Sequence, residues 1–175
     1  MEKFRLLTAD EIECRVKKIT EKGAVILLYK TARTDMDILD ESVGPENWVN
    51  DYREIKGNLY AGIGIRQEDG SFVWKWDCGI ESREDGEGNE KKGEASDAFK
   101  RAGFRWGIGR ELYTAPFIFF PAEGMDIKRS EYNGKPVFKT FDNFFVEKIL
   151  FDEKRRISAI SVKNSNTGKR WVWQK

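Results

Sequence analysis

Residues 48–80 read WVNDYREIKGNLYAGIGIRQEDGSFVWKWDCGI, and this stretch decides the fold. Two sets of side chains alternate strictly along 59–66 and again along 72–80. A period of two is typical of β-strands, whose successive side chains point to opposite faces. Turn-forming segments at 56–58 and 68–71 separate these two strands from each other and from a first strand at 48–55. The pattern predicts a three-stranded antiparallel meander.

A basic amphipathic helix is predicted after the meander. Residues 81–93 are polar and acidic and contain three glycines, which is typical of a loop. The apolar residues beyond this loop recur on one helical stripe, which comprises Ala95, Ala98, Phe99, Ala102 and Trp106. Because this stripe must pack on the sheet, the cations that lie off it should face outward.

The flanking segments predict further elements. A capping box formed by Thr8 and Glu11, followed by apolar residues at helical spacing, predicts a helix at 9–21 that ends at Gly23. Residues 24–29 predict a strand, and residues 34–43 predict a second helix that ends at Gly44-Pro45. Short strands return from about residue 126, and a second antiparallel meander is expected over 144–151, 157–163 and 169–174.

These elements predict an α+β fold and a single domain over 1–175. We expect an antiparallel β-β-β-α core within 24–112. An N-terminal helix should precede this core, and a C-terminal β-meander should follow it at 126–175.

Composition excludes several classes of function. The chain of 175 residues has no histidine, which removes Ser-His-Asp and Cys-His catalysis and most zinc chemistry. Cys14 and Cys78 are too few for a disulfide framework or a zinc site. No phosphate-binding P-loop motif occurs, so nucleotide hydrolysis is not expected. We therefore expect a protein that is not an enzyme and that needs no cofactor and no metal.

Charge and hydropathy say less about partners. The chain has 31 Lys and Arg against 30 Asp and Glu, so its net charge of +1 does not by itself favour nucleic acid. A basic surface would require these charges to separate in space. No apolar run approaches the roughly 18 residues of a membrane span, and the charged N-terminus does not resemble a signal peptide. The sequence predicts a cytoplasmic protein with no membrane partner.

Two groups of residues are candidates for binding a phosphate backbone, which requires cations at intervals. The first group lies on and just before the basic helix and comprises Lys91, Lys92, Lys100, Arg101 and Arg105. The second group is the exposed face of the meander, with Arg53, Tyr60, Arg66 and Lys75. Gly62 and Gly64 lie between them and would leave room for a backbone or a base. A solvated helix face, ordinary strand alternation or packing against another subunit would give the same patterns.

The order of residues over about 24–112 resembles the Rad-fifty-two family of recombination proteins, which includes phage single-strand annealing proteins of the Sak type. The residues that carry the resemblance are Tyr29, Gly44, Trp48, Asp69-Gly70-Ser71, Lys92, Ser96-Asp97, Lys100-Arg101-Ala102 and Trp106-Gly107. No single motif is decisive, but the ordered set with these spacings is specific. The C-terminal strands look more like those of phage relatives than like the eukaryotic pattern.

The resemblance implies a β-β-β-α core that assembles into rings and holds single-stranded DNA in a positively charged groove, with the bases exposed. Lys92, Lys100 and Arg101 match basic positions of that groove, and Ser96 matches a small hydroxyl residue near them. A further arginine of the family is replaced by Phe104, with Arg105 beside it, so the role of Arg105 stays open.

The expected function is ATP-independent annealing of complementary strands in homologous recombination and DNA repair, with a phage or prophage origin and a bacterial host cell. The expected partners are single-stranded DNA and further copies of the chain, with a single-strand-binding protein or an exonuclease as additional candidates. One alternative is a protein-interaction module that docks a partner on its aromatic meander. The other is a Mg²⁺-dependent nuclease that uses Asp77 and Glu81.

Overall fold

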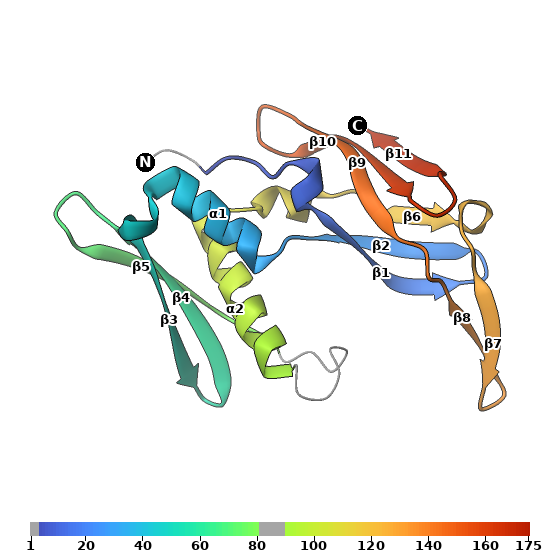
Figure 1. Cartoon of the computed structure of the whole chain (residues 1–175), viewed down its shortest axis with the longest axis horizontal. Coiled ribbons are helices and arrows are strands. Elements are labelled where there is room, and N and C mark those ends of the chain that lie inside the picture. The colour runs from blue at the N-terminus through green and yellow to red at the C-terminus, as the bar shows by residue number, and fades with distance from the viewer. Residues whose placement is uncertain (1–3, 81–89) are drawn as a thin grey trace. The chain divides into compact units, whose positions relative to one another are not determined.

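The computed structural model describes residues 4–80 and 90–175 (Figure 1). It is a mixed α+β structure built mostly of antiparallel sheets, with two α-helices in the described residues. The chain divides into two compact units. The first comprises Met1–Leu6 and Lys30–Arg110, and the second comprises Leu7–Tyr29 and Glu111–Lys175.

The first unit contains the predicted meander. Its elements are α1 (Ala32–Val43), the 3₁₀ turn Pro45–Asn47, β3 (Trp48–Ile55), β4 (Asn58–Arg66), β5 (Phe72–Cys78) and α2 (Glu90–Trp106). The strands form an antiparallel sheet with β4 in the middle, which confirms the alternation pattern. The predicted loop was too long, because α2 begins at Glu90. Residues 91 and 92 are lysines, good helix formers that extend α2 toward its N-terminus. The remainder of that loop, 81–89, lies outside the described residues.

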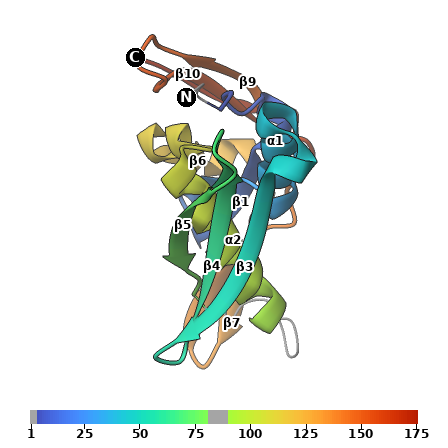
Figure 2. The same cartoon turned by 90° about the vertical axis from the view of Figure 1, so that its left-hand side faces the viewer.

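Helix α2 covers one face of this sheet (Figure 2). The predicted stripe is confirmed, with Ala98, Phe99, Ala102 and Trp106 buried and Ala95 half-buried. The stripe packs on β4, where Ala61, Ile63 and Ile65 are buried. The indole nitrogen of Trp106 donates to the carbonyl of Ile63 at 2.9 Å, so its polar atom is satisfied inside the core.

The C-terminus of α2 is closed by a glycine. Gly107 has a φ of +100°, a conformation that favours glycine. Its amide donates to Phe104, and the amide of Ile108 donates to Gly103, both at 3.0 Å. This paired arrangement is a Schellman motif. It ends the helix directly after Trp106.

The second unit is built around a six-stranded antiparallel sheet. Its strand order is β11-β10-β9-β1-β2-β6, and a separate two-stranded ribbon pairs β7 with β8. The bounds are β1 (Glu13–Thr20), β2 (Gly23–Tyr29), β6 (Ile118–Pro121), β7 (Lys128–Tyr132), β8 (Lys135–Lys139), β9 (Phe144–Phe151), β10 (Ile157–Asn164) and β11 (Arg170–Gln174). Short 3₁₀ turns occur at Ala9–Glu11, Arg110–Thr114 and Ala122–Gly124. The predicted strand at 24–29 and the three C-terminal strands are confirmed.

The predicted N-terminal helix at 9–21 is wrong. Only Ala9–Glu11 form a helical turn, in which Glu11 accepts from the amide of Thr8 at 2.9 Å, and β1 follows. The pairing of β1 with β2 shifts register between Val16 and Lys18. Such a bulge inserts one extra residue and breaks the period of two, so the apolar residues fall at helix-like intervals. Gly23 is the first residue of β2 and does not end a helix. A glycine is needed there because a side chain would clash with the carbonyl of Phe120 on the neighbouring strand β6.

Neither α1 nor α2 combines the length and the apolar character that a bilayer-crossing helix needs, and the same holds for every other helix of the described residues.

Candidate nucleic-acid interface

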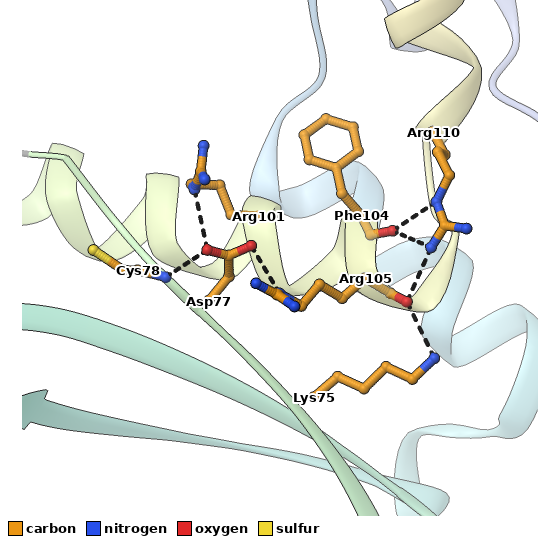
Figure 3. A network of polar contacts seen from close by, with 7 residues as sticks. All are labelled: Lys75, Asp77, Cys78, Arg101, Phe104, Arg105 and Arg110. Carbon is orange, nitrogen blue, oxygen red and sulfur yellow. Dashed lines mark hydrogen bonds and ion pairs between the residues drawn. The ribbon is translucent and has the colours of Figure 1, made fainter.

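Arg101 and Arg105 of α2 share one carboxylate on β5 (Figure 3). Asp77 accepts from Nε of Arg101 at 3.4 Å and from Nε of Arg105 at 3.0 Å. The geometry follows from two periodicities, because Asp77 points to the helix-covered face of the sheet and the arginines lie one turn apart. Their side chains remain 40% and 58% exposed, whereas that of Asp77 is 16% exposed.

The carboxylate of Asp77 is held in its charged form. Partial burial alone would raise its pKa, but the Cys78 amide, which donates at 2.8 Å, and the two arginines outweigh this effect. The pKa of Asp77 therefore lies below its usual value. Within the described residues, both arginines donate to Asp77 through Nε alone. Their terminal nitrogens are left for an external acceptor.

Two more cations lie at the C-terminal end of α2 (Figure 3). The ammonium group of Lys75 donates to the carbonyl of Arg105 at 3.1 Å and lies 4.2 Å from the centroid of the Trp106 ring. Arg110 donates to the carbonyl of Phe104 at 3.0 Å from Nε and at 2.7 Å from Nη2, and Nη2 also reaches the Arg105 carbonyl at 3.0 Å. Cations are favoured here because the C-terminal end of a helix dipole is negative.

Two acidic side chains of α2 are engaged by backbone amides of the first unit. Glu94 accepts from the amide of Leu59 on β4 at 3.3 Å, and Asp97 accepts from the amide of Ile80, just after β5, at 3.1 Å. The C-terminal half of α2 carries Arg101 and Arg105. Arg101 and Arg105 pair with Asp77, and Lys75 and Arg110 add two more cations on the carbonyl groups at the end of the helix. The near-neutral chain thus has a local cationic surface, which its total charge did not indicate.

The other candidate residues of α2 form a separate row. Lys92, Ser96 and Lys100 follow one another at intervals of four residues, and the carbonyl of Lys100 accepts from Lys30 at 3.2 Å. Since consecutive helical residues lie about 100° apart, Lys100 and Arg101 face different directions. Lys91 and Lys92 are exposed, while Ser96 and Lys100 are half-buried. The helix therefore carries two basic rows instead of one.

The sheet candidates do not share one face. The register places Arg53, Tyr60 and Arg66 on the face opposite α2. Lys75 lies on the covered face, where it contacts Arg105. The sheet separates these two sets, so the candidate residues do not converge on a single groove.

The expected room above Gly62 and Gly64 is filled. A Cβ at Gly62 would lie 2.5 Å from the indole of Trp76, and one at Gly64 would lie 2.8 Å from the indole of Trp74. These tryptophans are the cross-strand neighbours of the two glycines on β5. The glycines therefore admit indole rings of the same sheet, which corrects the expectation that a ligand approaches them directly.

Aromatic side chains form a row along β5 on the face opposite α2. The rings of Trp74 and Trp76 are stacked, with centroids 5.5 Å apart and planes at 22°. Phe72 extends the row, 6.4 Å from Trp74, and the guanidinium of Arg53 lies 4.4 Å from the centroid of Trp76. Phe72 and Trp74 remain 37% and 36% exposed. The sequence signal for this row was the pairing of two alternate glycines with two alternate tryptophans.

An open pocket of about 500 Å³ lies at β5 and is lined by Trp74, Lys75, Trp76, Arg105 and Arg110. Strand β5 is an edge of the three-stranded sheet. The lining residues belong to this edge strand, to the end of α2 and to the turn that follows it. Sequence reasoning missed Trp74, Trp76, Asp77 and Arg110 as members of one site.

A buried ion pair supports α2 from the α1 side. The ammonium group of Lys30 contacts both carboxylate oxygens of Asp35, and both side chains are almost fully buried. Lys30 also lies 4.2 Å from the centroid of the Phe104 ring. Burial raises the pKa of Asp35 to about 6, although Lys30 and Lys100 act in the opposite direction. The carboxylate is therefore ionised at neutral pH.

Carboxylates do not gather into a metal site within residues 4–80 and 90–175, where no group of three or more His, Cys, Asp or Glu side chains is placed to hold an ion. Of the two residues considered for a nuclease, Asp77 binds arginines and Glu81 lies outside the described residues.

Compared with protein-family models, with curated proteins and with solved structures, the chain matches none of them.

Proposed function

We propose that the chain binds single-stranded DNA through the cationic end of α2 and promotes annealing of complementary strands without ATP. The observation that carries the proposal is the pair Arg101 and Arg105, anchored through Nε on Asp77 with their terminal nitrogens outward. A guanidinium held in this way is suited to a phosphate, because its orientation is already fixed before binding. Lys75 and Arg110 add positive charge beside the pair.

The mechanism needs no reaction chemistry. Neutralising phosphates lowers the repulsion between two strands, and base pairing between the strands supplies the specificity. Binding should weaken steeply with salt, with a log–log slope of about −0.7 per phosphate neutralised on a single strand. The protein acts in this proposal as a binding surface and not as an enzyme.

The resemblance to the Rad-fifty-two family adds the biological setting. It supports a role in homologous recombination and DNA repair, a phage or prophage origin, and assembly into ring-like oligomers. A single-strand-binding protein or an exonuclease are the further partners it suggests. These parts of the proposal rest on the resemblance alone.

The test is annealing of two complementary oligonucleotides that carry a fluorescence donor and acceptor, without ATP or metal, across a salt series. We expect acceleration that fades as salt rises. Absence of both annealing and binding at low salt would reject the proposal.

The aromatic row supports a second candidate function. Exposed Phe72 and Trp74 on a sheet face that neither α1 nor α2 covers are also suited to contact another protein. A protein-interaction module of this kind would bind no DNA at any salt concentration. Its oligomeric state or partner binding would instead depend on the aromatic residues.

A further inference from the structure

We infer that the pocket at the edge of β5 holds one nucleotide of a bound strand, with the base against the tryptophan row and the phosphate on Arg105 and Arg110. This inference rests on the proposed function and deepens it, because it assigns a base-binding site beside the phosphate-binding surface. A surface that acts through phosphates alone would not distinguish a base from an abasic site.

The residues that line the pocket suit a ligand with a flat ring system and a negative charge. Its lining residues are two tryptophans, Trp74 and Trp76, and three cationic residues, Lys75, Arg105 and Arg110. Its volume of about 500 Å³ falls within the range of about 300–1,000 Å³ that is usual for small-molecule sites. A nucleotide combines both features that the lining selects for, a flat ring system and a phosphate. Hydrophobic peptides and inorganic anions each lack one of the two.

Donors for the phosphate are available on the cationic side of the pocket. Arg105 uses Nε on Asp77, and Arg110 uses Nε and Nη2 on helix carbonyl groups (Figure 3). Within the described residues, this leaves both Nη atoms of Arg105 and Nη1 of Arg110 without a protein acceptor. Each of the two side chains is thus fixed by some of its nitrogens and retains others for a ligand.

The aromatic side of the pocket is fixed before a ligand arrives. Trp74 lies against Gly64 and is stacked on Trp76, so its ring position is set by the sheet. Its exposed fraction of 36% leaves surface for a base. Stacking of bases on aromatic side chains tolerates any base, which suits a protein that binds DNA without reading its sequence.

The backbone of β5 adds polar groups at the same edge. The amide of Gly79 donates to the carbonyl of Leu59, which fixes the pairing so that alternate residues 73, 75 and 77 bond to β4. The amide and carbonyl groups of Trp74 and Trp76 therefore point away from β4, toward the open edge. Trp74 and Trp76 are lining residues of the pocket, so these groups are available to bond to the polar edge of a base.

The experiment compares binding of two fluorescently labelled oligonucleotides at low salt. One is a short oligothymidine, and the other has the same phosphates with alternate bases replaced by abasic sites. The variants are Trp74→Ala, Trp74→Phe and Phe72→Ala, the last being a matched control from the same row outside the pocket lining. Circular dichroism and size exclusion establish that each variant is folded and report its oligomeric state.

We expect the parent to bind the intact strand about tenfold more tightly than the abasic strand. Trp74→Ala should remove this difference, Trp74→Phe should retain part of it, and Phe72→Ala should keep it. Equal affinity of the parent for both strands would overturn the base site and leave phosphate binding standing. Absence of binding to either strand would overturn the proposed function together with this inference. A changed oligomeric state in Trp74→Ala, with no dependence on bases, would assign the row to contact between copies and overturn the inference.

Discussion

Arg105 donates to the carboxylate of Asp77 at 3.0 Å while its own side chain stays 58% exposed. The carboxylate therefore holds the guanidinium and at the same time cancels part of its charge. For a surface that binds phosphates, these two effects have opposite signs. Their balance can be measured, because asparagine retains the shape and the acceptor for the Cys78 amide while removing the charge.

We expect Asp77→Asn to bind single-stranded DNA roughly three- to tenfold more tightly at low salt, since one opposing charge is removed near the phosphates. The advantage should shrink as salt rises, and the salt slope should steepen. Stability should change little, because ion pairs of exposed arginines contribute about 0–1 kcal/mol. Fluorescence anisotropy across a salt series measures both affinity and slope. Weaker binding by Asp77→Asn would mean that Asp77 matters more as an anchor than as a competitor.

The two basic rows of α2 can be separated by charge-matched double variants. Arg101→Gln with Arg105→Gln removes two charges from the β5 side, and Lys92→Gln with Lys100→Gln removes two from the other row. We expect the arginine pair to cause the larger loss of affinity and to reduce the salt slope by about 1.4, or 0.7 for each phosphate contact. A larger loss in the lysine pair would move the DNA path to the row that contains Lys92, Ser96 and Lys100.

Gly62→Ala should destabilise the first unit by about 1–3 kcal/mol, because the new methyl group would overlap the indole of Trp76. Chemical denaturation measures the loss of unfolding free energy. Combining Gly62→Ala with Trp76→Val should recover part of that loss, since the smaller side chain makes room. A fully additive double variant would show that the two residues are not in contact.

Lys30→Met should cost about 3–5 kcal/mol of unfolding free energy at neutral pH, because Asp35 would stay buried without its ammonium partner. Lys30→Met combined with Asp35→Leu should be markedly more stable than Lys30→Met alone, as no charge is then left in the core. Lys154→Met, a change at an exposed lysine, is the control and should stay within about 0.5 kcal/mol of the parent. A stable Lys30→Met single variant would contradict the buried pair.

We expect Glu147 of β9 to make a contribution to the stability of the second unit that is lost in acid. Its carboxylate accepts from Nε and Nη2 of Arg170, both at 2.7 Å, and these bonds lower its pKa to about 2. In the unfolded chain this carboxylate takes up a proton near pH 4.5, whereas in the folded chain it does so only near pH 2. Its contribution to the unfolding free energy is therefore complete above pH 4.5 and is lost as the pH falls toward 2. Glu147→Gln should therefore flatten the pH dependence of unfolding in this window, as urea titrations at several pH values will measure. An unchanged pH dependence would exclude Glu147 as its source.

Elements with an undisturbed period were predictable from the sequence. The alternation of 59–66 and 72–78 gave the meander, and the stripe that ends at Trp106 gave α2, because each pattern reports directly on a buried face. Strand β1 was mistaken for a helix because the bulge between Val16 and Lys18 broke its alternation. A bulge is set by pairing with another strand, which local spacing does not contain.

The site was predictable only in part. Exposed Arg101 and Arg105 followed from the stripe, since whatever lies off a buried face points outward. Their sharing of Asp77 depends on the register of α2 over β5, and the place of Arg110 depends on the turn after Gly107. The pair formed by Lys30 and Asp35 depends on burial that composition does not reveal. These relationships arise between elements and not within one.

The division of the chain into interleaved segments sets the order in which the units can be completed during synthesis. All residues of the first unit have emerged once Arg110 has left the ribosome. In the second unit, Glu13 of β1 pairs with Phe145 of β9, which is translated 132 positions later. At about 5–20 residues per second, β1 waits roughly 7–26 seconds for this partner. The unit that carries the basic and aromatic surfaces can therefore fold while the larger sheet still lacks four of its six strands.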